Sequence, residues 1–176
     1  MKFGSLEFEP AGERLDLVAE PVKAALGQIG GDVLVAEIDP TLSDTAAFCD
    51  HYGIGMEVSA NCVVVEAKRG ERVWYAACMV LATTRADVNG VVRKQLDARK
   101  ISFAPMGTAV TLTGMEYGGI TPIGLPADWP LLVDAAVAGT ERVVIGGGVR
   151  TSKLLVPGAL LGRLPGAAVM DLVKAS

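Results

Sequence analysis

Two long apolar runs joined by a polar turn constrain the fold of this chain more than any other feature. Residues 61–67 read N-C-V-V-V-E-A, residues 72–83 form a second and longer run, and K-R-G-E lies between them. Runs rich in β-branched residues that flank a short polar turn with glycine are typical of a β-hairpin. The pattern therefore predicts two paired antiparallel strands.

Shorter segments of strand and helix character surround this hairpin. The length of 176 residues suits one domain, and the pattern predicts an α/β fold of the α+β type, with a mixed, largely antiparallel sheet and flanking helices. Strands are expected at 32–38, 101–104, 131–134, 142–145 and 153–156, helices at 41–51 (beginning at Thr41 or Ser43), 85–96, 105–113 and 157–164, and a last segment at 167–173.

The start of the chain has helical spacing. Apolar residues recur over 13–27, and Pro21 is expected to bend the helix or break it early. We therefore expect residues 1–31 to form an N-terminal helical extension of a domain that spans 1–176.

Composition and charge favour a packed globular protein. Hydrophobic residues make up 51% of the chain, and the net charge of −4 argues weakly against a large nucleic-acid footprint. Basic residues nevertheless concentrate at 85–100 and 142–153, so one local basic face remains compatible with an acidic chain. The run with Arg93, Lys94, Arg99 and Lys100 is more often a solvated surface than a patch for an RNA backbone.

Several functional classes are disfavoured by what the chain contains. His51 is the single histidine, no G-x-S-x-G segment is present, and Cys49, Cys62 and Cys78 form neither a zinc pattern nor a disulfide framework. We expect no metal and no cofactor. No secretory leader and no apolar run of the ~20 residues that a membrane span needs is evident, so a cytoplasmic protein without membrane contact is expected.

A glycine- and proline-rich loop at 114–130 is the first candidate for chemistry. Its apolar residues, including Ile123 and Trp129, predict an ordered and packed loop. Within it, Gly118 and Gly119 can point backbone N–H groups into a concavity that holds a carbonyl, an ester or a phosphate, while Pro122 stiffens the chain. A tight turn without a ligand is an equally good reading of these residues.

The run Gly146-Gly147-Gly148-Val149-Arg150 is the second candidate. It lacks the third glycine of G-x-G-x-x-G and the G-K-[ST] of a phosphate loop, and a strand is expected to follow it. A strand break beside a pocket fits better. Arg150 could reach a phosphate from there, although an isolated arginine is more often a solvated charge.

Taken in order, these motifs resemble the YbaK/EbsC family of prolyl-tRNA editing domains. The resemblance covers roughly Asp32 to the C-terminus and rests on N-C-V-V-V at 61–65, on 88–104, on G-M-E-Y-G-G-I-T-P-I-G at 114–124, on L-L-V-D at 131–134 and on V-V-I-G-G-G-V-R, which lies within 142–150. The 114–124 loop is the most specific of these motifs.

The resemblance implies a single domain with a curved, mixed sheet that hydrolyses the ester of a misacylated tRNA carrying a small amino acid. The substrate's own terminal ribose hydroxyl and a positioned water would do the chemistry, so no nucleophilic side chain is needed. The resemblance assigns a catalytic role to Gly118, Gly119 and Pro122. Substrate binding is expected from Asn61, Thr121, Gly146, Gly147, Gly148, Arg150 and Lys153. The partners would be the acceptor end of an aminoacyl-tRNA and, as a candidate, an aminoacyl-tRNA synthetase.

Three positions depart from the family pattern. Editing members carry a lysine where this chain has Asn61, many carry a serine at the position of Gly146, and many carry an acidic residue at the position of Lys153. The roles of those family residues are therefore not transferred to this chain. Lys153 and Lys94 are the candidates to supply a positive charge from another direction.

Three functions follow as hypotheses. The first is a trans-editing hydrolase, and the second is a catalytically silent module that binds an aminoacyl-tRNA end or a small aminoacyl or nucleotide ligand. The third is a protein-interaction domain anchored by Trp129, although packing of that side chain under its own loop is the more common arrangement.

Overall fold

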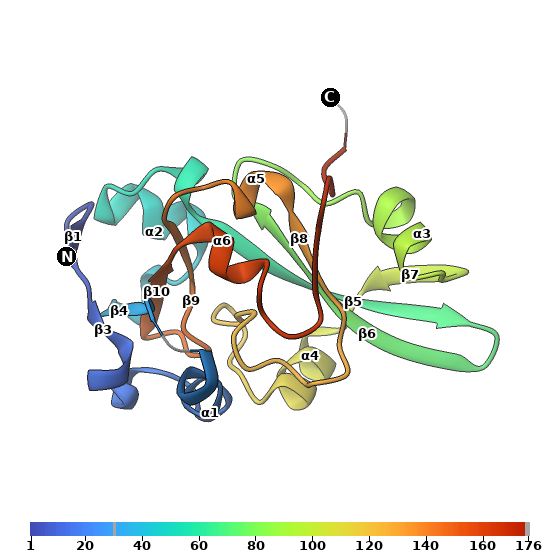
Figure 1. Cartoon of the computed structure of the whole chain (residues 1–176), viewed down its shortest axis with the longest axis horizontal. Coiled ribbons are helices and arrows are strands. Elements are labelled where there is room, and N and C mark those ends of the chain that lie inside the picture. The colour runs from blue at the N-terminus through green and yellow to red at the C-terminus, as the bar shows by residue number, and fades with distance from the viewer. Residues whose placement is uncertain (30, 175–176) are drawn as a thin grey trace.

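The long hairpin runs through the middle of the molecule (Figure 1). The structure, a computed structural model, describes residues 1–29 and 31–174. Strands β5 (Ala60–Arg69) and β6 (Arg72–Leu81) pair antiparallel along their whole length. Gly70, in the turn between them, has a φ of +61°, a conformation that favours glycine. The hairpin predicted from the sequence is confirmed.

The hairpin organises a five-stranded sheet in the order β11-β8-β6-β5-β7. Strand β7 (Lys100–Phe103) pairs antiparallel with β5. Strand β8 (Leu131–Asp134) pairs parallel with both β6 and β11 (Ala167–Met170). The sheet is therefore mixed, as the sequence predicts.

A second sheet of four antiparallel strands stands beside the first. Its order is β3-β4-β10-β9, made of β3 (Glu9–Pro10), β4 (Leu34–Glu37), β10 (Ser152–Val156) and β9 (Val143–Gly146). A parallel bridge between Ser59 and Val144 connects the two sheets. The predicted fold class is confirmed, while the one sheet that was expected is divided into two at this bridge.

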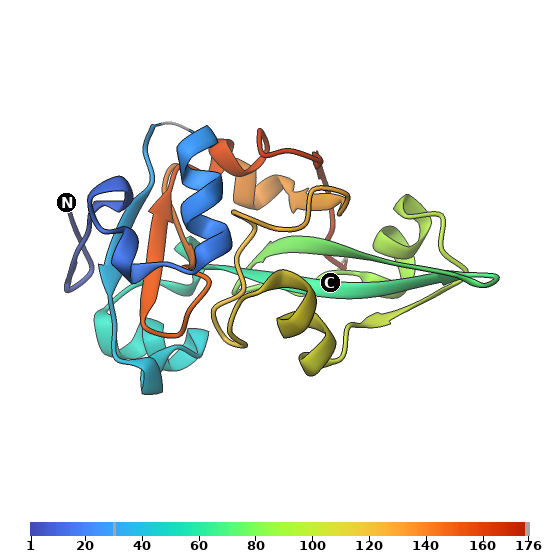
Figure 2. The ribbon, with the colours of Figure 1, turned by 90° about the horizontal axis from the view of Figure 1, so that it is seen from below.

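Helices cover both sheets, and α1 lies across the second one (Figure 2). The largest apolar core lies between α1 and strands of both sheets, with Val22, Met79 and Leu154 fully buried in it. The helices are α1 (Glu20–Ile29), α2 (Thr45–Tyr52), α3 (Arg93–Gln95), α4 (Met106–Thr113), α5 (Ala135–Ala138) and α6 (Gly158–Leu161), with a π-helical turn at Val88–Val92 before α3 and 3₁₀ turns at Ala11–Glu13, Leu15–Leu17, Pro40–Leu42 and Met56–Val58.

Three predicted helices begin later than the sequence pattern indicated. The helix expected to begin at Thr41 or Ser43 begins at Thr45, because Pro40–Leu42 forms a separate 3₁₀ turn. Helix α1 begins at Glu20 instead of residue 13, because Pro21 has no N–H and is tolerated only in a first turn. The helix expected over 85–96 begins at Val88, because the Asp87 carboxylate accepts hydrogen bonds from the N–H groups that follow it. Helix α5 was not predicted at all; it is only four residues long.

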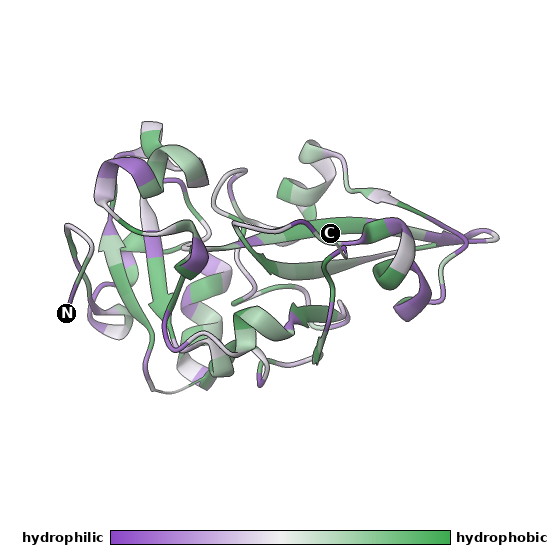
Figure 3. Ribbon diagram, turned by 90° about the horizontal axis from the view of Figure 1, so that it is seen from above, coloured by the Kyte–Doolittle hydropathy of each residue, from purple (hydrophilic) through white to green (hydrophobic). Residues whose placement is uncertain are grey.

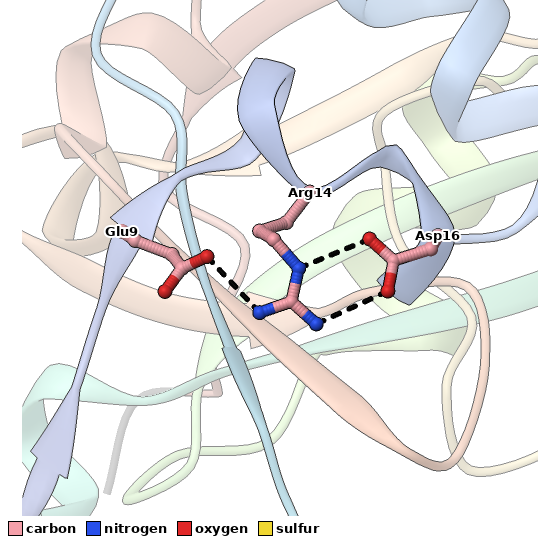
Figure 4. A network of polar contacts seen from close by, with 3 residues as sticks. All are labelled: Glu9, Arg14 and Asp16. Carbon is pink, nitrogen blue, oxygen red and sulfur yellow. Dashed lines mark hydrogen bonds and ion pairs between the residues drawn. The ribbon is translucent and has the colours of Figure 1, made fainter.

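The first residues are strands and turns instead of helix. Strands β1 (Lys2–Phe3) and β2 (Leu6–Glu7) pair with each other, and β3 joins the second sheet. Arg14 then holds the following turns by binding the carboxylates of Glu9 and Asp16 over 3.1 Å, with two bonds to Asp16 (Figure 4). The guanidinium lowers the pKa of Asp16 below its ordinary value. The extension predicted over 1–31 and the domain predicted over 1–176 include residues 30, 175 and 176, which lie outside the described residues.

Candidate functional site

A cavity of about 470 Å³ opens beside α2, where the two sheets meet. Its walls come from the start of α2, the start of β5, the end of β9, the middle of β10 and the loop that follows α4. Four of the predicted site residues line it: Asn61, Gly118, Gly146 and Lys153. The structure therefore brings residues from four separate segments of the sequence together at one cavity, and their roles stay a prediction. Its volume lies within the range of small-ligand sites.

Asn61 is held in the cavity wall by a neighbour from α2. The hydroxyl of Thr45 donates to Asn61 Oδ1 over 2.7 Å, so the amide oxygen is already used. An amide carries two N–H donors on its nitrogen. The NH₂ group of Asn61 is therefore the part of this side chain that is available to a ligand.

Lys153 brings an amino group into the same cavity from β10. Only 7% of this residue is exposed, its Nζ donates to the Ser43 carbonyl over 3.0 Å, and Nζ also lies 5.2 Å from the centre of the Phe48 ring. Burial lowers the pKa of Lys153 below its ordinary value of 10.5. An ammonium group has three N–H donors, so donors beyond the one bound to Ser43 remain for a ligand.

Two glycine loops cross beside the cavity with their backbones in direct contact. The Gly148 N–H donates to the Gly119 carbonyl over 2.7 Å, and the Glu116 N–H donates to the Gly148 carbonyl over 2.9 Å. A Cβ at Gly119 would lie 2.6 Å from the Val149 carbonyl oxygen, and one at Gly146 would lie 2.5 Å from the Gly119 carbonyl oxygen. Glycine is required at these positions because no side chain fits between the two loops.

These contacts decide which N–H groups are free to bind a ligand. The Gly119 N–H donates to the Glu116 carbonyl over 2.9 Å, and the Gly148 N–H is used by the other loop. Gly118 and Ile120, which line the cavity, donate no backbone hydrogen bond to any other residue within 1–29 and 31–174. The expectation that both paired glycines offer an N–H group to a ligand is therefore wrong for Gly119, whose N–H is used within its own loop. The cavity-lining residues with an unused N–H are Gly118 and Ile120, and Ile120 was not predicted.

Arg150 reinforces the loops from outside the cavity. Its guanidinium donates to the Tyr117 carbonyl over 3.4 Å and to the Pro40 carbonyl over 3.2 Å, and its backbone N–H donates to Glu116 Oε1 over 2.7 Å. Arg150 is not part of the cavity wall. In this structure it ties the loop after α4 to the turn before α2.

The other predicted site residues lie behind the cavity wall. Thr121 is fully buried, and its hydroxyl has no hydrogen-bond partner among the described residues. Pro122 faces a separate, largely apolar hollow beside α1. Gly147 packs on Ser152, and Gly148 packs on Ala19. Direct contact between these four residues and a substrate stays a prediction.

Comparison with known proteins identifies the family. A model of the aminoacyl-tRNA editing domain matches residues 39–164, which include every wall of the cavity. The chain belongs to the aminoacyl-tRNA editing domain family. The resemblance seen in the sequence is thereby confirmed, and membership supports a role in aminoacyl-tRNA editing, with an aminoacyl-tRNA as the substrate class.

Solved structures share the fold of this editing domain. One described as a candidate trans-editing enzyme for prolyl tRNA synthetase is 21% identical, with a TM-score of 0.75, and the match covers 96% of this chain and all of that one. Another, described only as a hypothetical protein, is 22% identical with a TM-score of 0.77 over 88% of this chain and all of that one. A search of curated protein sequences gives no significant match.

The departures from the family pattern meet in one place in this editing domain. Asn61, which the sequence resemblance places at the position of a family lysine, stands on one sheet and Lys153 stands on the other, yet both line the same cavity. Lys94 does not; it lies in a separate hollow with Arg69 and Asp97. Of the two lysines that could supply the charge missing at Asn61, only Lys153 is therefore in place.

The three cysteines and Trp129 are packed within the fold. Cys49 and Cys78 are buried, Cys62 is half-buried, and burial raises the pKa of Cys78 to about 12, which disfavours the thiolate. Trp129 is 7% exposed and stacks on Tyr75 with 5.8 Å between ring centres, so it packs under its loop. The loop at 114–130 is ordered around it, as predicted.

Two negative findings apply to residues 1–29 and 31–174. No group of three His, Cys, Asp or Glu side chains there is arranged to hold a metal ion. No helix in that part of the chain has the length and apolarity needed to cross a lipid bilayer.

Sequence reasoning missed several cavity residues. Ser43 was considered only as a candidate to begin a helix, and Thr45 was not considered. Yet Ser43 binds Lys153, which is 110 residues away, and Thr45 binds Asn61, which is 16 residues away. Tyr117 was missed as well. It lines the cavity with 53% of its surface exposed, and an aromatic residue next to paired glycines is a signal that could have identified it.

The crossing of the two loops predicts a strong effect of one methyl group. Gly119→Ala places a Cβ against the Val149 carbonyl, so we expect the free energy of unfolding to fall by about 1–3 kcal/mol. Gly107→Ala, in α4 with nothing within 4 Å of its Cβ, is the matched control and should gain about 0.5–1 kcal/mol. Urea unfolding followed by circular dichroism measures both. Equal stability of the two variants would contradict the tight crossing.

The buried amine predicts a pH dependence of stability. The folded state lowers the pKa of Lys153, so between that value and 10.5 the unfolded chain binds the extra proton and unfolding becomes less favourable as pH rises. Relative to Lys153→Met, the wild type should therefore gain stability as the pH is raised from neutral toward 10.5. Urea titrations of both proteins at stepped pH provide the difference. A difference that stays flat or falls with pH would contradict the desolvated amine.

Proposed function

We propose that this editing domain hydrolyses the ester of a misacylated tRNA that carries a small amino acid, in the cavity beside α2. The observation that carries the proposal is the composition of that cavity. It presents the NH₂ group of Asn61, the amine of Lys153 and the free N–H groups of Gly118 and Ile120 around a space of about 470 Å³. An array of hydrogen-bond donors of this kind suits an anionic or ester ligand.

The chemistry is attack of water on the ester carbonyl. The water oxygen bonds to the carbonyl carbon, a tetrahedral anion forms, and the bond from that carbon to the ribose oxygen breaks. The proton lost by the water ends on the ribose oxygen, directly or through the adjacent ribose hydroxyl, so the products are a free amino acid and a deacylated tRNA. Backbone N–H groups that meet the developing oxyanion lower the barrier of such a step. In this domain, Gly118 and Ile120 are the donors available for it.

Each predicted residue then has a distinct part. Gly118 and Ile120 shape the acyl end of the cavity, and Gly119 keeps their loop in place through its contact with the second loop. Asn61 and Lys153 contact the terminal ribose or its phosphate. Arg150 holds the loop in position through the Tyr117 and Pro40 carbonyls.

An exposed aromatic residue fits the base of the terminal nucleotide. Tyr117 stands at the rim of the cavity, which continues into a shallow groove with Phe103 and Met106, residues that are 66% and 56% exposed. Unpaired bases stack on such side chains in proteins that bind single-stranded RNA. We place the adenine of the tRNA end against Tyr117.

A second candidate function is ligand binding without turnover. The observation that favours it is Asn61, whose amide brings no charge where editing members have a lysine and whose oxygen is occupied by Thr45. A protein-interaction role anchored by Trp129 has less support, because that side chain is buried.

The first prediction of the proposal is deacylation of a specific mischarged tRNA. The purified protein is incubated with proline-specific tRNA charged with alanine, cysteine, serine or proline, and loss of the aminoacyl ester is followed over time. We expect hydrolysis of at least one small mischarged amino acid and none of the proline ester. No hydrolysis of any member, combined with measurable binding of the same tRNAs, would favour the silent module instead.

A substitution at Asn61 tests the cavity itself. Asn61→Ala removes the available NH₂ group, and loss of one neutral hydrogen bond to the substrate should lower kcat/KM by roughly 3- to 10-fold. Gln28→Ala removes an exposed amide on α1 and should leave kcat/KM unchanged. The measurement is the rate of deacylation at substrate concentrations below KM. An unchanged rate for Asn61→Ala would remove this residue from the site.

A further inference from the structure

A cluster of cations surrounds the far end of the hairpin, away from the cavity. They come from the end of β5, from α3 and from the start of β7, and Figure 3 shows hydrophilic residues where β5 ends and β6 begins and along α3. The hairpin cluster consists of Lys68, Arg69, Arg93, Lys94, Arg99 and Lys100. These residues line two hollows of about 450 and 560 Å³, and Arg93 and Arg99 border both of them.

The strand register brings these cations together. Lys68 on β5 stands directly opposite Lys100 on β7, and the Arg99 N–H donates to the Lys68 carbonyl over 2.8 Å. Directly opposed like charges destabilise a pair of strands. An anion bound across these two exposed lysines would reduce the repulsion between them and so stabilise the strand pair.

The charges of the hairpin cluster are only partly neutralised. Lys68 pairs with Glu66 at 3.4 Å, and Arg69 pairs with Asp97 at 3.2 Å. The remaining four cations make no ion pair within 1–29 and 31–174. Six cations less two carboxylates leave the cluster at +4, whereas the whole chain has a net charge of −4, so the rest of the chain is at −8. Because of this difference in charge, the hairpin cluster is the part of the surface to which a polyanion is attracted.

Strand β5 connects the hairpin cluster to the cavity. Because side chains alternate along a strand, Cys62, which lines the cavity, and Lys68, which belongs to the cluster, point to the same face of β5. Six residues of strand separate them by about 20 Å. A distance of about 20 Å corresponds to a few nucleotides of an RNA strand.

We infer that the hairpin cluster binds the phosphate backbone of the acceptor helix of the tRNA whose 3′ end occupies the cavity. This inference rests on the proposed function. The cavity would receive the aminoacylated end, and the first base pairs of the helix would reach the cluster along β5. Lysine and arginine side chains on a shallow surface suit the regular phosphates of an RNA helix and read no base sequence.

The test is binding of deacylated tRNA as a function of salt. In Arg99→Gln/Lys100→Gln, two exposed cations without ion pairs are neutralised. The control Lys2→Gln/Arg163→Gln removes two exposed cations from other parts of the chain, with the same change of net charge. Fluorescence anisotropy with labelled tRNA gives Kd between 50 and 200 mM salt. We expect the first variant to bind about 10-fold more weakly and to lose about one unit of salt slope per contact, and the control to match the wild type.

A short substrate separates this inference from the proposed function. An aminoacylated CCA trinucleotide reaches the cavity but not the hairpin cluster, so Arg99→Gln/Lys100→Gln should hydrolyse it at the wild-type rate while hydrolysing the full tRNA more slowly. Absence of hydrolysis by every protein would overturn the proposed function, yet the tRNA-binding difference would still support the cluster. Equal Kd values and salt slopes for wild type, variant and control would overturn the cluster, whatever the hydrolysis shows. An equal loss in both variants would also overturn it, because net charge alone would then explain binding.

Discussion

The contact between the two glycine loops is the constraint on which the candidate site depends. The Gly119 carbonyl accepts from the Gly148 N–H, and the space beside both residues is too small for a Cβ. This contact fixes the loop after α4 against the end of β9, and so decides where Gly118 and Ile120 direct their N–H groups. Gly119 and Gly148 thus act by letting two backbones touch, since both of their N–H groups are used within the protein.

The cavity also depends on the way in which the two sheets meet. Asn61 belongs to one sheet and Lys153 to the other, and the bridge from Ser59 to Val144 holds the strands that carry them close together. Helix α2 completes the arrangement, because Thr45 binds Asn61 and the residue before the helix cap, Ser43, binds Lys153. The cavity therefore combines an amide from one sheet with an amine from the other.

Much of this architecture was predictable from local patterns. The hairpin, the later strands and the packed loop follow from apolar runs and from glycine and proline signals. Four of the residues that the motifs single out line one cavity in the structure. The rest depended on contacts distant in sequence. The start of α1 required Pro21 to outweigh the helical spacing that precedes it, and the division into two sheets has no local signal. The Ser43 carbonyl that binds Lys153 and the Pro40 carbonyl that binds Arg150 each lie 110 residues away, so no pattern along the chain could reveal them.

The segment before the family match has a consequence for any shortened form of the protein. The family model begins at residue 39, but the Ala19 N–H donates to the Gly147 carbonyl, the Ala19 methyl group blocks a Cβ at Gly148, and the Pro21 carbonyl blocks one at Gly124. The residues around the start of α1 thus pack against both glycine loops and support them. A chain trimmed to residues 39–164 would keep every residue that lines the cavity, but it would lose the contacts that Ala19 and Pro21 make with the two glycine loops. The segment that the family model matches is therefore shorter than the segment whose contacts hold the site together.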